Sequence, residues 1–394
     1  MKKLMVVGLL LAFLLSGCGV PGGGAAGGGA AILYKAQEES ETVKIGLNLE
    51  LSGAVASYGN QERDGIMLAT EEINKDGGIN GKQIELVTKD NKSDTAEAAS
   101  VASSLTTKEQ VVVIVGPATS GASKAIIPNI TKTQTPAITP SGTDDGITVL
   151  NGKVQEYIFR ASFQDSFQGV ILANYAYESL NAKKAVIIGD VSSDYAKGLT
   201  KSFKDTYQGE IVADEKFSQK DKDFKAILTK LKDKDFDFIY LPGYYEEAGL
   251  IIKQAREMGI KQPILGADGF SDEKLVTIAG AKNMNQIFYT SHFSEKAPGS
   301  DKVVQFINNF EAKYGKKPSA FNALAYDSIY MIKASLEGEA KMNSGVLTKN
   351  LSTLIDFEGV TGKMTMDKNH NPRKPAVVIG LEKGKQHSAD VVEP

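Results

Sequence analysis

Cysteine, histidine and tryptophan are scarce in this chain of 394 residues, which has one cysteine, three histidines and no tryptophan. A single cysteine excludes an intramolecular disulfide, so stability must come from packed cores. The histidines (His292, His370 and His387) are scattered and lack a partner at metal-ligand spacing. Their scarcity disfavours transition-metal chemistry and histidine-based catalysis. We therefore expect neither a metal nor another cofactor.

Long apolar runs and excess positive charge are missing as well. After Leu15 no segment is apolar over the roughly 18 residues that a membrane-spanning helix needs. Residues 1–17 contain Lys2 and Lys3 but no acid, and without them the chain carries 43 basic against 48 acidic residues, a net charge of −5. This charge balance provides no positive electrostatic field that would attract nucleic acid. The roughly 350 residues that follow the N-terminal segment are too many for one small core and suit two lobes.

The N-terminal segment has the features of a secretory signal. Two lysines precede the short apolar run Leu4–Leu15, and small residues follow it. Such a segment is removed and does not join the fold. The string Leu15-Ser16-Gly17-Cys18 resembles the lipobox of bacterial lipoproteins, in which the cysteine becomes the lipid-bearing first residue. We predict a signal peptide over residues 1–17 and lipidation of Cys18, with a free thiol behind an ordinary signal as the alternative.

Residues 18–42 are rich in glycine and alanine and then polar. The stretch from Gly22 to Gly27 satisfies the pattern G-x-G-x-x-G, but no strand precedes it, as a dinucleotide-binding loop requires. We therefore predict a flexible tether with a reach of roughly 25 Å. It would leave the lipid anchor as the only membrane contact and hold the protein at the extracytoplasmic face.

From Val43 onward, strand-like and helix-like segments alternate. Val43–Leu51 predicts a strand, Asn60–Lys75 a helix, and the Val/Ile run Val111–Val115 a buried parallel strand. The pattern restarts after residue 160, and the last predicted strand is Ala376–Leu381. Alternating βα units form parallel sheets covered by helices on both faces. We therefore predict an α/β protein with two doubly wound parallel-sheet lobes.

Small polar residues follow the predicted strands of the first lobe, as in Gly116–Ser123 and Thr139–Asp145. Ligands of doubly wound sheets bind beyond the carboxyl ends of the strands, and the N–H groups at a helix start favour a negative group. The corresponding loops of the second lobe supply tyrosines and one acid, Asp268. Together these residues suit an amino acid. Taken singly, each Ser or Thr is equally typical of a helix N-cap, and each Tyr of the edge of a core.

At these residues the chain resembles the branched-chain amino-acid (Leu/Ile/Val) binding proteins of bacterial ABC transporters, which have the type I periplasmic-binding fold. The resemblance extends from residue 43 to about 382. The matching strings are Leu51-Ser52-Gly53 with Tyr58-Gly59, the turn Ile73–Lys82, Ile138-Thr139-Pro140, Asp194–Gly198, Phe238-Ile239-Tyr240 leading to Gly243-Tyr244, and Ile252–Arg256.

The resemblance implies how the charged groups of the ligand would be held. Ser120 and Thr143 would bind its carboxylate through hydroxyl and backbone N–H groups. Asp268, the Thr143 hydroxyl and the Ser141 carbonyl would meet its ammonium, and Gly142 belongs to the same set. The best-known members carry the longer Glu at the position of Asp268, so here the contact must be shorter or the loop closer.

The resemblance also implies the rest of the pocket and the domain division. The residues implied to close over the ligand or to border its side chain are Tyr195 and Tyr244 from the second lobe, and Tyr58, Ala118, Thr119 and Phe321. Hinge crossings near residues 162, 292 and 372 would divide the chain into an N-terminal lobe, 43–162 plus 292–372, and a C-terminal lobe, 163–291 plus 373–394. The restart of the βα pattern near residue 160 independently supports the first crossing.

The expected function is that of the extracytoplasmic solute-binding component of an ABC importer. It would bind a free amino acid, with Leu, Ile or Val expected and aromatic or small polar ones left open, and deliver it as a monomer to the permease. A sensor of the same fold for another amino acid, an amide or a small metabolite is the alternative. An acyl-transfer enzyme is disfavoured, because Ser271-x-x-Lys274 lacks its accompanying motifs and Ser271-Asp272 is typical of a helix start. We do not expect an enzyme.

Overall fold

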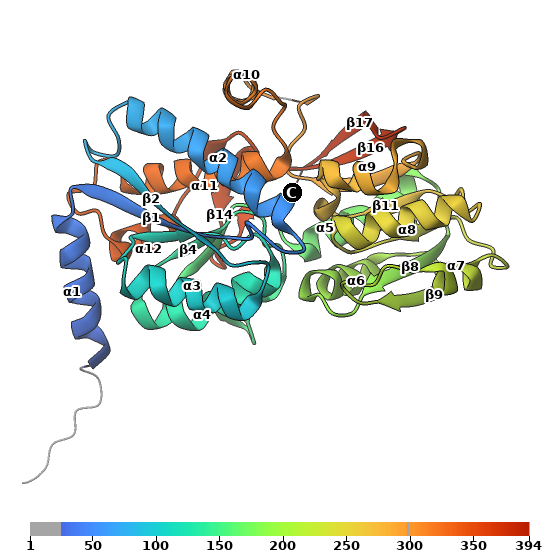
Figure 1. Ribbon diagram of the computed structural model, residues 1–394, viewed down its shortest axis with the longest axis horizontal. Helices are drawn as coiled ribbons and strands as arrows, with labels where there is room; N and C mark the ends of the chain where they lie inside the picture. The colour runs from blue at the N-terminus through green and yellow to red at the C-terminus, as the bar shows by residue number, and fades with distance from the viewer. Residues whose placement is uncertain (1–24, 298, 394) are drawn as a thin grey trace, which may run out of the picture.

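Two separate β-sheets organise the part of the chain that the computed structural model describes, residues 25–297 and 299–393, and each sheet forms the centre of one lobe (Figure 1). The first sheet is parallel throughout, as predicted. Its strands, in spatial order, are β2 (Gln83–Asp90), β1 (Thr42–Leu49), β3 (Val113–Val115), β4 (Ala137–Thr139) and β7 (Ile158–Arg160).

The second sheet has seven strands and departs from the prediction at one edge. Its spatial order is β17 (Lys385–Val392), β16 (Ala376–Glu382), β12 (Ile287–Ser291), β11 (Ile264–Gly266), β10 (Phe238–Tyr240), β8 (Lys184–Asp190) and β9 (Glu210–Phe217). The five strands from β12 to β9 are parallel, whereas β16 pairs antiparallel with both β12 and β17. The prediction of a parallel-sheet lobe holds for these five strands. The antiparallel edge was not predicted, and it arises because the chain re-enters the second lobe in the opposite direction and turns back in a hairpin.

Helices cover both sheets. Those of the first lobe are α2 (Ala56–Lys75), α3 (Thr95–Thr107), α4 (Ser120–Thr133), α10 (Asp301–Tyr314), α11 (Ala320–Leu336) and α12 (Ser344–Ser352). Those of the second are α5 (Asp165–Asn174), α6 (Asp194–Thr206), α7 (Lys225–Leu231), α8 (Tyr245–Glu257) and α9 (Glu273–Ala279). Smaller elements are the hairpin β5 (Val149–Leu150) and β6 (Lys153–Val154), the sheet of β13 (Phe357–Gly359), β14 (Gly362–Met366) and β15 (Pro372–Arg373), 3-10 turns at Asp145–Ile147, Asp268–Phe270 and Ala281–Asn283, and a π-helical turn at Tyr175–Ser179.

Each lobe has its own hydrophobic core, and consecutive strand residues are buried because both faces of each sheet are covered. In β1, all five successive residues from Ile45 to Leu49 are buried. Burial of a large apolar side chain contributes about 1.5–3 kcal/mol to folding. Helices α2 and α11 pack closely because a Cβ at Gly65 would lie 2.1 Å from the carbonyl oxygen of Asn322. This contact holds the middle of α2 against α11, and α2 carries Tyr58 in its first turn.

The chain passes between the lobes three times, from β7 to α5, from β12 to α10 and from β15 to β16. The crossing segments contact one another. Phe163 stacks on His292 with ring centroids 3.6 Å apart, and Lys374 Nζ donates to the carbonyl of Ala161 at 3.1 Å. The three crossings therefore form one continuous connection between the lobes.

The predicted tether is helical in its second half, where α1 (Ala25–Glu39) lies against the first lobe (Figure 1). Leu33 is buried, Tyr34 Oη donates to the carbonyl of Gln134 at 3.2 Å, and Gln37 Nε2 donates to the carbonyl of Val111 at 2.9 Å. These contacts correct the expectation of a flexible chain from residue 25 onward. The predicted signal peptide and Cys18 lie outside the described residues. Within those residues, no helix has the length and apolar character to cross a membrane.

Candidate ligand-binding site

A small, narrow cavity lies between the lobes. It is lined by Tyr58, Ala118, Thr119, Ser120, Ser141, Tyr195, Tyr244, Asp268, Gly269 and Phe321. Nine of the eleven predicted ligand-binding residues are in this set, and Gly269 is the one lining residue that the sequence analysis did not name. The loops after β3, β4, β10 and β11 supply most of the lining, as expected for the carboxyl ends of parallel strands.

Gly142 and Thr143 do not line the cavity. The Gly142 N–H donates to Thr139 Oγ1 at 2.9 Å, and its carbonyl accepts from Arg160 and Ser162, each at 3.1 Å. Gly142 therefore shapes the loop after β4. Thr143 is fully buried next to it, and its hydroxyl has no hydrogen-bond partner among the described residues.

Direct contacts between the lobes close the cavity. Tyr58 Oη, on α2, donates to the carbonyl of Gly269 at 2.6 Å and accepts from the backbone N–H of Tyr245 at 3.2 Å. Gln61 Nε2 donates to Asp272 Oδ2 at 2.7 Å. Tyr58 is thus both a wall of the cavity and a link across the cleft.

Aromatic rings form the apolar part of the lining. Tyr58 stacks on Phe321 with centroids 4.3 Å apart, and Tyr195 stacks on Tyr244 at 5.0 Å with the two rings nearly parallel. Tyr58 meets Tyr244 edge to face at 5.8 Å, so the two pairs join across the lobes. This arrangement suits a small apolar group between the rings.

The start of α4 is partly occupied by a carboxyl group of the chain itself. Glu50, which follows β1, accepts from the N–H groups of Ala118 and Thr119 at 3.0 and 3.1 Å and from Thr119 Oγ1 at 2.8 Å. Burial raises the pKa of Glu50, and these donors oppose the shift. At this helix start, Ser120 is therefore the residue that can still donate to a ligand anion. Its hydroxyl accepts from the Asp144 N–H at 3.2 Å and keeps its own proton to donate.

Ser141 is held by a second buried acid, Glu62. Ser141 Oγ lies 2.6 Å from Glu62 Oε1 and 2.9 Å from the carbonyl oxygen of Ala118. A hydroxyl has one proton and cannot donate to both. Burial raises the pKa of Glu62 well above its usual range, so a protonated Glu62 donates to Ser141, which donates to Ala118. This relay joins three residues of the first-lobe wall.

Asp268, at the end of β11, receives three donors from the second lobe and its boundary. Its Oδ1 accepts from Tyr195 Oη at 2.7 Å and from Gln168 Nε2 at 3.1 Å. Its Oδ2 lies 3.2 Å from His292 Nε2. Burial lowers the pKa of His292 to about 4, so this histidine donates in its neutral form. Three neutral groups therefore hold the carboxylate without cancelling its charge.

A further buried carboxyl, Asp165, shares one of these donors. Gln168 Nε2 donates to Asp165 Oδ1 at 2.9 Å, while Asp165 Oδ2 has no partner among the described residues. Burial, and then the neighbouring charge of Asp268, raise the pKa of Asp165 well above its usual range. This setting therefore favours the neutral form of Asp165.

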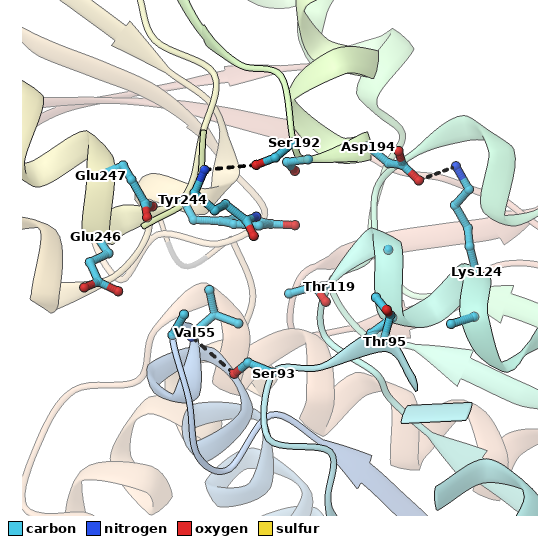
Figure 2. Close-up of a pocket in the computed structure, with 16 residues that line it drawn as sticks. Val55, Ser93, Thr95, Thr119, Lys124, Ser192, Asp194, Tyr244, Glu246 and Glu247 are labelled. Atoms are coloured by element: carbon cyan, nitrogen blue, oxygen red, sulfur yellow. Dashed lines mark hydrogen bonds and ion pairs between the residues drawn. The ribbon is translucent and has the colours of Figure 1, made fainter. Parts of the chain in front are cut away.

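Next to the cavity lies a groove of about 1190 Å³ that is open to solvent, and Thr119 and Tyr244 border both spaces (Figure 2). Lys124 of α4 and Asp194 of α6 face each other across the groove with Nζ and Oδ2 2.9 Å apart. Lys124 also lies 3.4 Å from Asp144 Oδ1. This pair adds a charged contact between the lobes, and in solvent such a contact contributes at most about 1 kcal/mol.

The Ser271-x-x-Lys274 pattern is a helix start. Asp272 caps α9 by accepting from the Lys274 N–H at 2.7 Å, and the Lys274 side chain is exposed. Ser271 Oγ donates to Ser291 Oγ at 3.1 Å, so serine and lysine do not form a catalytic pair. In residues 25–297 and 299–393, no three His, Cys, Asp or Glu side chains are grouped to hold a metal ion.

Two α/β lobes that are joined by three crossings and close over a small cavity define a class of proteins that trap solutes. The match to known families is specific. A profile of the periplasmic binding protein family matches residues 42–386, and the chain belongs to this family. Its fold is the type I periplasmic binding protein fold, as predicted.

Similar proteins are named for branched-chain amino acids. The chain is 52% identical to LivJ of Streptococcus pneumoniae, a branched-chain amino acid transporter substrate binding protein solved with isoleucine, over 90% of this chain and 100% of that chain with a TM-score of 0.86. It is 31% identical to the leucine binding protein LivK of Thermotoga maritima, over 90% and 99%, with a TM-score of 0.84. The leucine-, isoleucine-, valine-, threonine- and alanine-binding protein of Pseudomonas aeruginosa is 29% identical over 83% of this chain and 86% of its own length.

Proposed function

We propose that this protein is the solute-binding component of an ABC importer and binds a free branched-chain amino acid between its lobes. The observation that carries the proposal is the carboxyl group of Asp268, which lines the cavity, is 3% exposed and is held only by neutral donors. A buried charge without a counter-ion is unfavourable. The site therefore favours a ligand with a cationic group, such as the ammonium of an amino acid.

The remaining features of the cavity support the same ligand class. The cavity is far smaller than pockets for drug-sized molecules, which hold roughly 300–1,000 Å³, and this favours a small ligand. Ser120, at the start of α4, provides a hydroxyl proton and a helix N-terminus for a carboxylate. Rings on both sides suit an aliphatic side chain. The names of the similar proteins agree with this choice.

Thermal unfolding of the purified protein with each of the twenty amino acids tests the proposal. A ligand at 1,000 times its Kd should stabilise the protein by about 4 kcal/mol. We expect a clear shift with leucine, isoleucine or valine, and a much smaller one with the corresponding 2-hydroxy acids, which lack the ammonium and should bind more weakly. The absence of a shift with every aliphatic amino acid would refute the proposal, and a shift only with an amide or another metabolite would favour a sensor.

We propose further that the protein works by binding alone, without turnover, as a monomer anchored by lipid at Cys18 on the extracytoplasmic face, from which it delivers its ligand to the permease. The basic start, short apolar run and Leu-Ser-Gly-Cys string support the anchor. Mass spectrometry of the protein from membranes should show a diacylated N-terminal Cys18, and Cys18→Ala should release the protein from the membrane. Membrane retention of the variant would contradict the lipid anchor while leaving the ligand proposal intact.

A further inference from the structure

The side chains behind Asp268 have their hydrogen-bond directions fixed. Gln168 Oε1 accepts from the Asp268 N–H at 3.2 Å and from Thr290 Oγ1 at 2.7 Å. A backbone N–H can only donate, so the amide oxygen faces Asp268 N and the Nε2 group faces the carboxyl groups. His292 Nε2 faces a carboxylate oxygen, which only accepts, so this nitrogen carries the proton. Both side chains therefore act as donors to Asp268.

We propose that Gln168 and His292 are positioning residues that hold the Asp268 carboxylate for the ammonium group of the ligand. The inference rests on the proposed function and adds two residues that do not line the cavity. With Tyr195, these donors use three of the roughly four acceptor positions of a carboxylate. They fix the carboxylate in one orientation, and one acceptor position remains for the ligand.

The neutrality of these donors is part of their role. A protonated histidine would pair with Asp268 and cancel the charge that attracts the ammonium. His292 lies in a setting that disfavours its cation. It is buried, it stacks on Phe163, Lys374 lies nearby, and its Nδ1 has no acceptor among the described residues. Asp268 is the acid that faces it. The site thus gains a fixed hydrogen bond and keeps its negative charge.

The two positioning residues come from the connection between the lobes. His292 directly follows β12, at the second crossing, and Gln168 lies in the first turn of α5, just after the first crossing. Both side chains are almost inaccessible to solvent. The carboxylate that meets the ammonium is therefore held by residues next to two of the three crossings between the lobes.

Titration calorimetry of the purified protein with isoleucine and with 2-hydroxy-3-methylpentanoate, which replaces the ammonium by a hydroxyl, tests the proposal. His292→Leu removes a hydrogen bond to a charged group. The loss should weaken isoleucine binding about 10- to 100-fold. The hydroxy acid does not need the charge, and its affinity should change less than about threefold. His292→Gln keeps an N–H donor of similar reach and should restore most of the affinity for isoleucine.

His387→Leu is the matched control, because His387 is exposed on β17, and it should bind both ligands as the wild type does. Gln168→Met removes the other positioning residue and is titrated with the same two ligands. It provides the test if His292→Leu fails to fold. Wild-type affinity for isoleucine in the folded variants, or equal loss of both ligands, would overturn the positioning role. If the wild type binds no amino acid, the proposed function itself fails. Loss of isoleucine binding in Asp268→Asn but not in the positioning variants would reject this inference alone.

Discussion

Replacing Asp268 by asparagine removes one negative charge from the closed cavity and changes little else. The amide has almost the same size, and its oxygen still accepts from Tyr195 Oη and Gln168 Nε2. His292 can accept from the new amide N–H after a change of tautomer. We therefore expect Asp268→Asn to fold like the wild type. What it loses is the attraction to an ammonium, which at about 4 Å and an effective dielectric constant of about 20 amounts to about 4 kcal/mol.

That energy corresponds to an affinity about 1,000-fold lower, and thermal unfolding at one fixed ligand concentration makes the difference visible. At 1,000 times the wild-type Kd, the ligand stabilises the wild type by about 4 kcal/mol, whereas the same concentration only equals the Kd of Asp268→Asn and adds about 0.4 kcal/mol. The shift in melting temperature should therefore almost vanish in the variant. A shift close to that of the wild type would refute the reasoning and show that the ligand is held without this charge.

Three further changes test other parts of the structure. Burial lowers the pKa of His292 to about 4, whereas the histidine of the unfolded chain is protonated near pH 6.5. The free energy of unfolding should therefore fall by about 3 kcal/mol between pH 6.5 and 4. Denaturant titration should show this loss in the wild type and a smaller one in His292→Gln. Lys374→Met removes the amino group near the buried Asp327 and the hydrogen bonds to the carbonyl of Ala161 and to Thr361 Oγ1. It should destabilise the protein by about 1–3 kcal/mol, whereas Lys374→Met with Asp327→Asn should be milder in the same titration. Glu62→Gln keeps a donor for Ser141, and calorimetry should show the same ligand affinity as in the wild type. Glu62→Ala should bind the ligand more weakly. Equal affinities of the two variants would contradict the relay through Ser141.

The fold could be predicted from the sequence where a strand is buried on both faces, because such strands read as continuous apolar runs. The run Val111–Val115 shows this, and β3 lies within it. The edge strand β17 could not be predicted in this way. Its sequence Lys385–Val392 is polar and half exposed, and it pairs only with β16. Helix α1 was not predicted for a different reason. Its glycine-rich start has low helix propensity, and its contacts, such as that of Gln37 with Val111, join residues far apart in the sequence.

The loops that supply most of the lining were predictable because parallel strands bring their carboxyl ends to one edge, so residues after different strands meet there. Tyr58 and Phe321, which lie on helices, were implied only by the family resemblance. The groups that govern the electrostatics of the cavity were not predictable. Gln168 and Glu62 lie within helices, where the sequence pattern does not distinguish an inward polar residue from a solvated one. His292 was recognised only as an isolated histidine. Glu50 carried a usable signal, since an acid at the end of a buried strand needs donors, and here they come from the start of α4.

The four buried acids around the cavity explain why closure should depend on the ligand. Glu62 and Asp165 each have an oxygen without a partner among the described residues, and burial favours their neutral forms. Glu50 does not line the cavity and receives three donors from Ala118 and Thr119, whereas Asp268 lines it and also receives three donors. Closing the empty cleft would therefore bury the charge of Asp268 without a counter-ion, which is unfavourable. An ammonium removes that cost only in the closed form, so the ligand shifts the equilibrium by its differential affinity for that form. The same carboxylate that binds the ligand thereby opposes closure in its absence.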